Sequence, residues 1–198
     1  MSEKPTPATA SKQRRVLVTA LVLNLGLAAA LAVAGLYADS SSLIANALDN
    51  ASDGVVYALS LAAVGASGSS KRDAATVSGV LLIVLAVGIL GDTARRYIYG
   101  SEPVGPVMMG LAVIAAAINL ICLKLLQRLR SDDTNIKAAR TFSFNDFVSN
   151  GGVLVAGVLV AVTGARWPDL AVGALVAAIS LKGGIEILRD AQQTRSID

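Results

Sequence analysis

Long stretches without a charged residue restrict this chain more than any other feature of its sequence. No Asp, Glu, Lys or Arg occurs in residues 16–38, 54–70, 74–91, 104–123 or 147–165. A sixth stretch, 170–181, reaches spanning length if Lys182 extends its ammonium group to the membrane surface. A helix needs roughly 20 mostly apolar residues to cross a hydrocarbon core about 30 Å thick. The sequence therefore predicts an all-α membrane protein, a bundle of six transmembrane helices.

The composition leaves little room for anything else. Of 198 residues, 54% are hydrophobic and 16% are charged, whereas soluble domains carry about 25% charged residues. The first apolar stretch is too long for the core of a cleaved signal peptide. We expect a disordered N-terminal tail over residues 1–15, a transmembrane domain over 16–192 and a short C-terminal tail over 193–198.

Lys and Arg are distributed unevenly between the two sides of such a bundle. With six helices, fourteen of the seventeen basic residues lie on the side of the termini, and only Arg95, Arg96 and Arg166 lie on the other. Because cytoplasmic loops are enriched in Lys and Arg, both termini are predicted to be cytoplasmic, in the inner (plasma) membrane. The basic residues follow the inner membrane face, so no nucleic-acid partner is expected.

Three acidic residues lie within the predicted spans, away from their ends: Asp49, Asp53 and Asp146. A charged side chain at the bilayer centre costs roughly 2.5–3.5 kcal/mol even on insertion scales. No Lys or Arg lies within a span to pair with them. A bound cation or protons must therefore offset the charge.

The spacing of these residues favours one shared site. Asp49 and Asp53 are four residues apart, so they share a helix face, and Asn46 lies on that face. Asp146 and Asn150 have the same spacing in the fifth helix. The chain has no histidine, so ligands would be oxygen atoms, which suit hard or borderline divalent cations. Zinc, cadmium, cobalt, manganese and iron all stay open.

The polar residues of the predicted spans also allow other interpretations. The three acids could be protonated groups that tie helices together in a non-transporting scaffold subunit, or they could line a cation channel or uniporter without proton coupling. Asn24 and Asn119 are expected to form hydrogen bonds between helices, and Asp39 and Asp92 to act as caps or vestibule groups. No nucleophile–base pair, phosphate-binding loop or cofactor motif occurs, so an enzyme is not expected.

Three segments resemble the cation diffusion facilitator family: GLYADSSSLIANALDNASD at 35–53, FSFNDFVSNGGVLV at 142–155 and WPDLAVG at 167–173. The resemblance covers about residues 16–192 and places Asp49 and Asp53 at metal-ligand positions. It implies a homodimer that exports a divalent metal by proton antiport. The transport site would be tetrahedral, lie between the second and fifth helices, and open alternately to each side. Zinc is the first expectation for the cargo, and no permanent cofactor is expected.

The sequence departs from the family pattern in three ways. Phe142 stands where the family has His or Asp, four residues before Asp146. Asn145 is the predicted replacement, although it lies about 100° round the helix from Asp146; Ser143, Asn150 and Asn46 are alternatives. The histidine-containing loop between the second and third helices is absent. The cytoplasmic C-terminal metal-binding domain is also missing, so this short form is expected to dimerise through its membrane helices.

Overall fold

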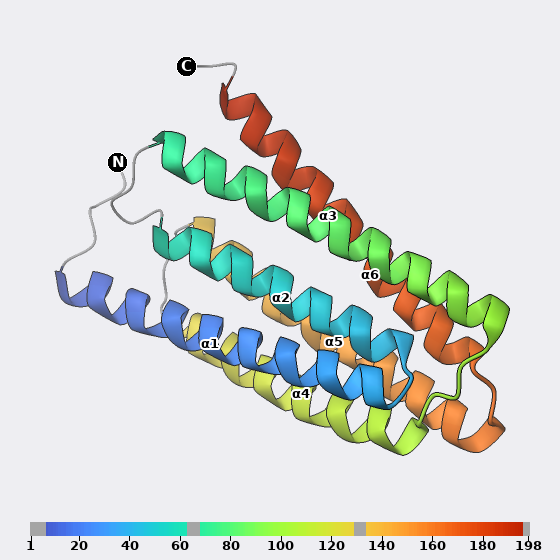
Figure 1. The fold of residues 1–198 in the computed structure, drawn as a ribbon. Coiled ribbons are helices and arrows are strands. Elements are labelled where there is room, and N and C mark those ends of the chain that lie inside the picture. Colours follow the sequence, from blue (N-terminus) through green and yellow to red (C-terminus); the bar gives the residue numbers. More distant parts are fainter. Residues whose placement is uncertain (1–6, 63–67, 129–133, 196–198) are drawn as a thin grey trace.

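A computed structural model describes residues 7–62, 68–128 and 134–195. These residues form six antiparallel helices and no strand (Figure 1): α1 (Pro7–Tyr37), α2 (Ser41–Ala62), α3 (Gly68–Tyr99), α4 (Gly105–Gln127), α5 (Thr134–Thr163) and α6 (Trp167–Arg195). The start of α1 and the end of α6 lie at the same end of the bundle. The predicted all-α bundle is confirmed, whereas the cytoplasmic placement of that end stays a prediction.

Four helices in the described part of the chain are long and apolar enough to cross a membrane: Ser11–Tyr37, Thr76–Tyr99, Gly105–Gln127 and Trp167–Arg189. The α2 helix has 22 residues, which gives about 33 Å at 1.5 Å per residue. Its length therefore suffices, and the polar residues on one of its faces account for its lower hydropathy. The apolar part of α5 that the structure describes without a gap is Ser149–Thr163, which lies within the longer uncharged stretch 147–165.

The α2 helix occupies the centre of the bundle. The most extensive contacts pair α1 with α2, α3 with α6 and α4 with α5, and α2 also contacts α3, α5 and α6. In Figure 1 the α3–α6 pair lies beside the group formed by α1, α2, α4 and α5. Side chains on the polar face of α2 are therefore surrounded by protein.

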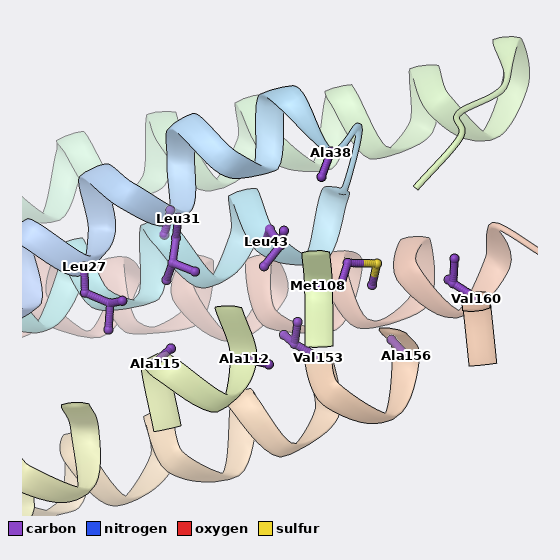
Figure 2. Close-up of a cluster of buried hydrophobic side chains, with 11 residues drawn as sticks. Leu27, Leu31, Ala38, Leu43, Met108, Ala112, Ala115, Val153, Ala156 and Val160 are labelled. Atoms are coloured by element: carbon purple, nitrogen blue, oxygen red, sulfur yellow. The ribbon is translucent and has the colours of Figure 1, made fainter. Parts of the chain in front are cut away.

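The main apolar core fills the space between α1, α2, α4 and α5 (Figure 2). Buried side chains of this core include Leu31 from α1, Leu43 from α2, Met108 from α4 and Val153 from α5. The buried residues of α4 recur every three or four positions, as expected for one helix face packed against its neighbours.

A close approach of α4 and α5 requires glycine. A Cβ atom at Gly105 would lie 2.6 Å from the carbonyl oxygen of Gly157 and 2.8 Å from the amide nitrogen of Ala161. Both are backbone atoms, so neither can rotate away, and the helices would have to separate. Small residues at helix contacts permit such approaches in membranes.

Gly105→Ala is therefore expected to destabilise the protein by about 1–3 kcal/mol, the usual cost of overpacking. Gly110→Ala, in the same helix, is the matched control because a Cβ atom there meets nothing within 4 Å. Thermal unfolding in detergent measures both variants, and the control should match the wild type or exceed it. Equal unfolding temperatures for the two variants would show that this approach is not tight.

Several helix ends differ from those predicted. The α1 helix begins at Pro7, so residues 7–15 are helical although the sequence predicted a disordered tail. The α3 helix runs from Gly68 to Tyr99, beyond both ends of the uncharged stretch 74–91. Likewise, α5 begins at Thr134. Lys, Arg, Gln and Ala are good helix formers, so the charged residues mark the edge of the hydrocarbon and not the end of each helix.

Candidate metal site

The structure brings the three predicted acids together between α2 and α5. The side chains of Asp53 and Asp146 are each 2% exposed, and Asp49 lies one turn from Asp53 on the same face of α2. The Asp146 carboxyl group is in hydrogen-bonding contact with both Asp49 and Asp53. Ser149 of α5 also contacts Asp49. Each acid therefore has another acid as a direct neighbour.

These contacts are pairwise and centre on Asp146. Within the described part of the chain, no three His, Cys, Asp or Glu side chains form a ready-made metal-ligand group. A hydrogen bond between two carboxyl groups requires a proton on one of them. The arrangement therefore places carboxyl groups so close together that a proton or a cation must neutralise part of their charge. A cation that replaced those protons would have to draw the carboxylates round itself.

A layer of asparagines next to the acids joins α2 to α5. Asn46 donates from Nδ2 to Oδ1 of Asn150 over 2.7 Å, and Asn50 donates to the carbonyl oxygen of Asn46 over 2.8 Å. Asn150 in turn donates to the backbone carbonyl of Asp146 over 2.7 Å. Asn46 and Asn150 are thus bonded to each other, and their role here is to fix the positions of the two acid-bearing helices.

Two further residues bear on the predicted ligand set. Tyr57, fully buried one turn beyond Asp53, donates its hydroxyl to Oδ2 of Asp53 over 3.4 Å. The sequence analysis did not single out Tyr57, although its spacing of four residues from Asp53 places it on the same face. Asn145 lies in α5, but its side chain, like that of Ser143, is outside the described part of the structure. The predicted role of Asn145 as a ligand therefore stays a prediction.

Comparison with known proteins identifies the family. A family model described as the cation efflux transmembrane domain matches residues 17–194. This chain is a cation diffusion facilitator. Cation diffusion facilitators are a family of transporters and not of enzymes, which accords with the absence of catalytic motifs in the sequence.

Three curated relatives show the range of the family. A cadmium, cobalt and zinc/H(+)-K(+) antiporter from Bacillus velezensis is 25% identical over 89% of this chain and 61% of its own length. The metal cation efflux system protein CzcD from Cupriavidus metallidurans is 28% identical over 82% and 55%, respectively. The manganese efflux system protein MneP from Bacillus subtilis is 25% identical over 93% and 70%. The chain thus spans 55–61% of the length of the first two relatives.

In this facilitator, the end of α2 nearest the α1–α2 turn is fixed by Asp169 of α6. The fully buried Asp169 carboxylate accepts hydrogen bonds from the backbone amides of Ser41 and Ser42, at 2.7 and 3.1 Å, and from the Ser40 and Ser42 hydroxyls, both at 2.6 Å. The Ser40 hydroxyl also accepts from the amide of Leu43 over 3.2 Å, as an N-cap does. The sequence analysis missed Asp169. The one feature that could have pointed to it is an acidic residue in the first turn of a membrane helix.

An ionic cluster joins α3 to the α1–α2 turn at the same end of the facilitator. Asp39 lies in the turn after α1 and has a φ of 51°, a left-handed conformation that Asp tolerates. Arg96, 4% exposed, donates to Asp39 and to Asp92, the latter over 2.5 Å. Asp39 also accepts from the amide of Glu102 over 2.8 Å. Asp39 thus forms an ion pair with α3, and its predicted role as a cap or vestibule group stays a prediction.

Arg96→Leu is expected to destabilise the facilitator by about 1–2 kcal/mol, a value reduced from that of a buried pair because Asp39 and Asp92 are partly exposed. Arg95→Leu is the matched control, since Arg95 is 57% exposed and bonds only to Asp92, within its own helix. Chemical unfolding of both variants in detergent tests this difference. A loss with Arg95→Leu as large as that with Arg96→Leu would contradict it.

Proposed function

We propose that this protein exports a divalent transition-metal cation in exchange for protons, by alternating access. One observation carries the proposal: three acidic side chains meet inside a membrane bundle, and residues 41–62 and 146–163 contain no Lys or Arg to neutralise them. Such a cluster needs protons or a cation. An exchange of one for the other at Asp49, Asp53 and Asp146 is the chemical basis of antiport.

The cargo and the coupling follow from the ligand chemistry and from the relatives. Carboxylates bind a divalent ion only after they release their protons, so binding from the cytoplasm expels protons and protons from outside displace the metal. The relatives' names include zinc, cadmium, cobalt and manganese, and one names an antiporter. Zinc is the first candidate for this chain, as transported cargo and not as a resident cofactor. Iron is a further candidate from ligand type alone.

The proposal extends to the setting of the transporter. The protein lies in the plasma membrane with both termini cytoplasmic, as the distribution of Lys and Arg favours. Large apolar side chains on the outer faces of the bundle, such as Val22, Val84 and Val162, are more than half exposed and suit contact with lipid. The working unit is a homodimer formed through membrane helices, in line with the family resemblance.

Proteoliposomes test this proposal. The purified protein is reconstituted in both orientations, an acidic lumen is established, and uptake of Zn²⁺, Cd²⁺, Co²⁺, Mn²⁺ and Fe²⁺ is followed against a concentration gradient. We expect uphill uptake of at least one cation that stops when an ionophore dissipates the pH gradient. Downhill flux that does not depend on the pH gradient would indicate a uniporter or channel, and the absence of flux would favour a scaffold. Either result contradicts the proposal.

A further inference from the structure

Two asparagines, one on α1 and one on α4, lie at the depth of the acids. Asn24 of α1 donates from Nδ2 towards the Cys122 sulfur of α4 over 3.8 Å, and the Cys122 thiol is close enough to Asp53 for a Coulombic interaction. A Cβ atom at Gly54, next to Asp53, would lie 2.7 Å from Leu25, next to Asn24. Asn24, Cys122 and Asp53 therefore share one level of the bundle.

Asn119 lies at the same level on α4. It precedes Cys122 by three residues, and both belong to the buried face of that helix. The Gly105–Gly157 contact fixes how antiparallel α4 and α5 are aligned. In antiparallel helices, positions equally far along the chain from such a contact lie opposite each other. Asn119 therefore lies opposite the turn of α5 that contains Asp146. Asn119 therefore faces the region of the acids from α4.

Several polar atoms at this level have no hydrogen-bond partner within the described structure. They are both amide atoms of Asn119, Oδ1 of Asn24, Oδ1 of Asn50 and Oδ2 of Asp146. Asn24 and Asn119 are each 1% exposed. A polar group that is buried and left unpaired is unfavourable. The predicted role of Asn119 as a hydrogen-bonding link between helices is therefore wrong within the described residues. Asn24 donates to the carbonyl oxygen of Ala20 in its own helix over 2.9 Å and reaches α4 through the weak contact with sulfur.

We propose that Asn24 and Asn119 are cation-binding residues, whose carboxamide oxygens complete from α1 and α4 the coordination shell of the ion held by Asp53 and Asp146. This inference rests on the proposed function and adds ligands from α1 and α4 to the carboxylates of α2 and α5. A carboxamide oxygen is a ligand for hard cations, and the amide group of Asn119 can donate to a carboxylate or to a metal-bound water. Three unpaired oxygens, on α1, α4 and α5, would thereby acquire one common partner.

The added ligands should increase the binding affinity for some cations more than for others. Together with Asp49, such a site offers three aspartates and two asparagines, five oxygen donors, which exceeds the four ligands that zinc takes in tetrahedral sites. Oxygen-rich sites suit ions such as Mn²⁺. Asn24 and Asn119 should therefore contribute more to the binding of Mn²⁺ than to that of Zn²⁺. A purely structural role for these residues would affect both ions alike.

The test is calorimetric titration of Mn²⁺ and Zn²⁺ into the full-length protein in detergent. Asn119→Leu removes both unpaired amide atoms at similar volume, and we expect Mn²⁺ affinity to fall at least 10-fold, with Zn²⁺ affinity falling less than about 3-fold. Thr93→Val is the matched control, because it removes an unpaired buried hydroxyl of α3. That control should leave both affinities unchanged. The thermal stability of Asn119→Leu should equal or exceed that of the wild type.

Unchanged Mn²⁺ affinity in Asn119→Leu, or equal losses for both ions, would overturn the inference. If this variant does not fold, the same Mn²⁺-to-Zn²⁺ comparison in Asn24→Leu decides. Asp53→Asn separates this inference from the proposed function. If Asp53→Asn abolishes the binding of both ions while Asn119→Leu changes neither, the carboxylate site stands and the asparagines do not belong to it. No binding of either ion to the wild type would overturn both.

Discussion

Replacing Asp146 with asparagine is expected to abolish metal-driven proton flux and to weaken cation binding by more than about 100-fold. Asp146 contacts both of the α2 acids, so its loss removes a ligand and also breaks the link between the carboxyl groups of α5 and α2. The fold should not suffer, because a neutral amide of the same shape is cheaper to bury in a membrane than a carboxylate. Unfolding temperature should stay the same or rise.

Binding and flux should be measured on the same preparation of the Asp146→Asn variant, together with its unfolding temperature. Glu186→Gln is the control, since Glu186 is 60% exposed on α6 and forms an ion pair with Lys182 at 3.7 Å. That control should transport like the wild type. Flux close to that of the wild type in Asp146→Asn would show that Asp146 is not part of the transport site. The same result in Asp49→Ala would show that the α2 acid is not part of it.

Asp169→Ala is expected to have the largest effect on stability, a loss of about 3–5 kcal/mol. The alanine variant would leave two backbone amides of α2 and two serine hydroxyls without the acceptor that they now share. Each hydrogen bond to a charged group contributes about 1.5–3 kcal/mol, and partial replacement by water reduces the sum. The contacts of α6 with α2 should loosen at this end of the bundle.

Thermal unfolding in detergent measures this loss, with Asp169→Asn as the partner variant. Asparagine keeps one acceptor oxygen, so it should recover part of the lost stability. Ser180→Ala is a further comparison on α6, because the Ser180 hydroxyl bonds only to the carbonyl oxygen of Val176 in its own helix, over 3.1 Å, and its loss should be small. If Asp169→Ala unfolds at the wild-type temperature, the serines have other partners in solution.

Sequence patterns predicted the parts of this structure that depend on local periodicity and hydropathy. Long apolar stretches located the six helices, and the four-residue spacing of Asp49 and Asp53 placed both on the face that meets Asp146. The family assignment rested on motifs that lie in α2, α5 and α6. Each of these inferences needs only residues close together in the chain, apart from the assumption that the polar faces of two helices turn towards each other.

Contacts between distant residues were beyond reach of the sequence. Asp169 lies more than a hundred residues from the serines that it binds, and no periodicity shows which helix end an acid will cap. Asn46 was weighed as a ligand, yet it bonds to Asn150, because only the packed structure shows which carboxamides meet. Asn24 and Asn119 were assigned to helix–helix bonds for the same reason. Asn145 stays a prediction, since its side chain lies outside the described part of the structure.

The most direct measurement of the central claim is the number of protons released when a cation binds. Calorimetric titration of Zn²⁺ and Mn²⁺ at one pH, in buffers with different ionisation enthalpies, gives that number for the wild type. We predict one cation per chain, release of at least one proton, and tighter binding as pH rises, because protons and metal compete for the same carboxylates. Binding without proton release, or no binding of any divalent cation, would contradict the account.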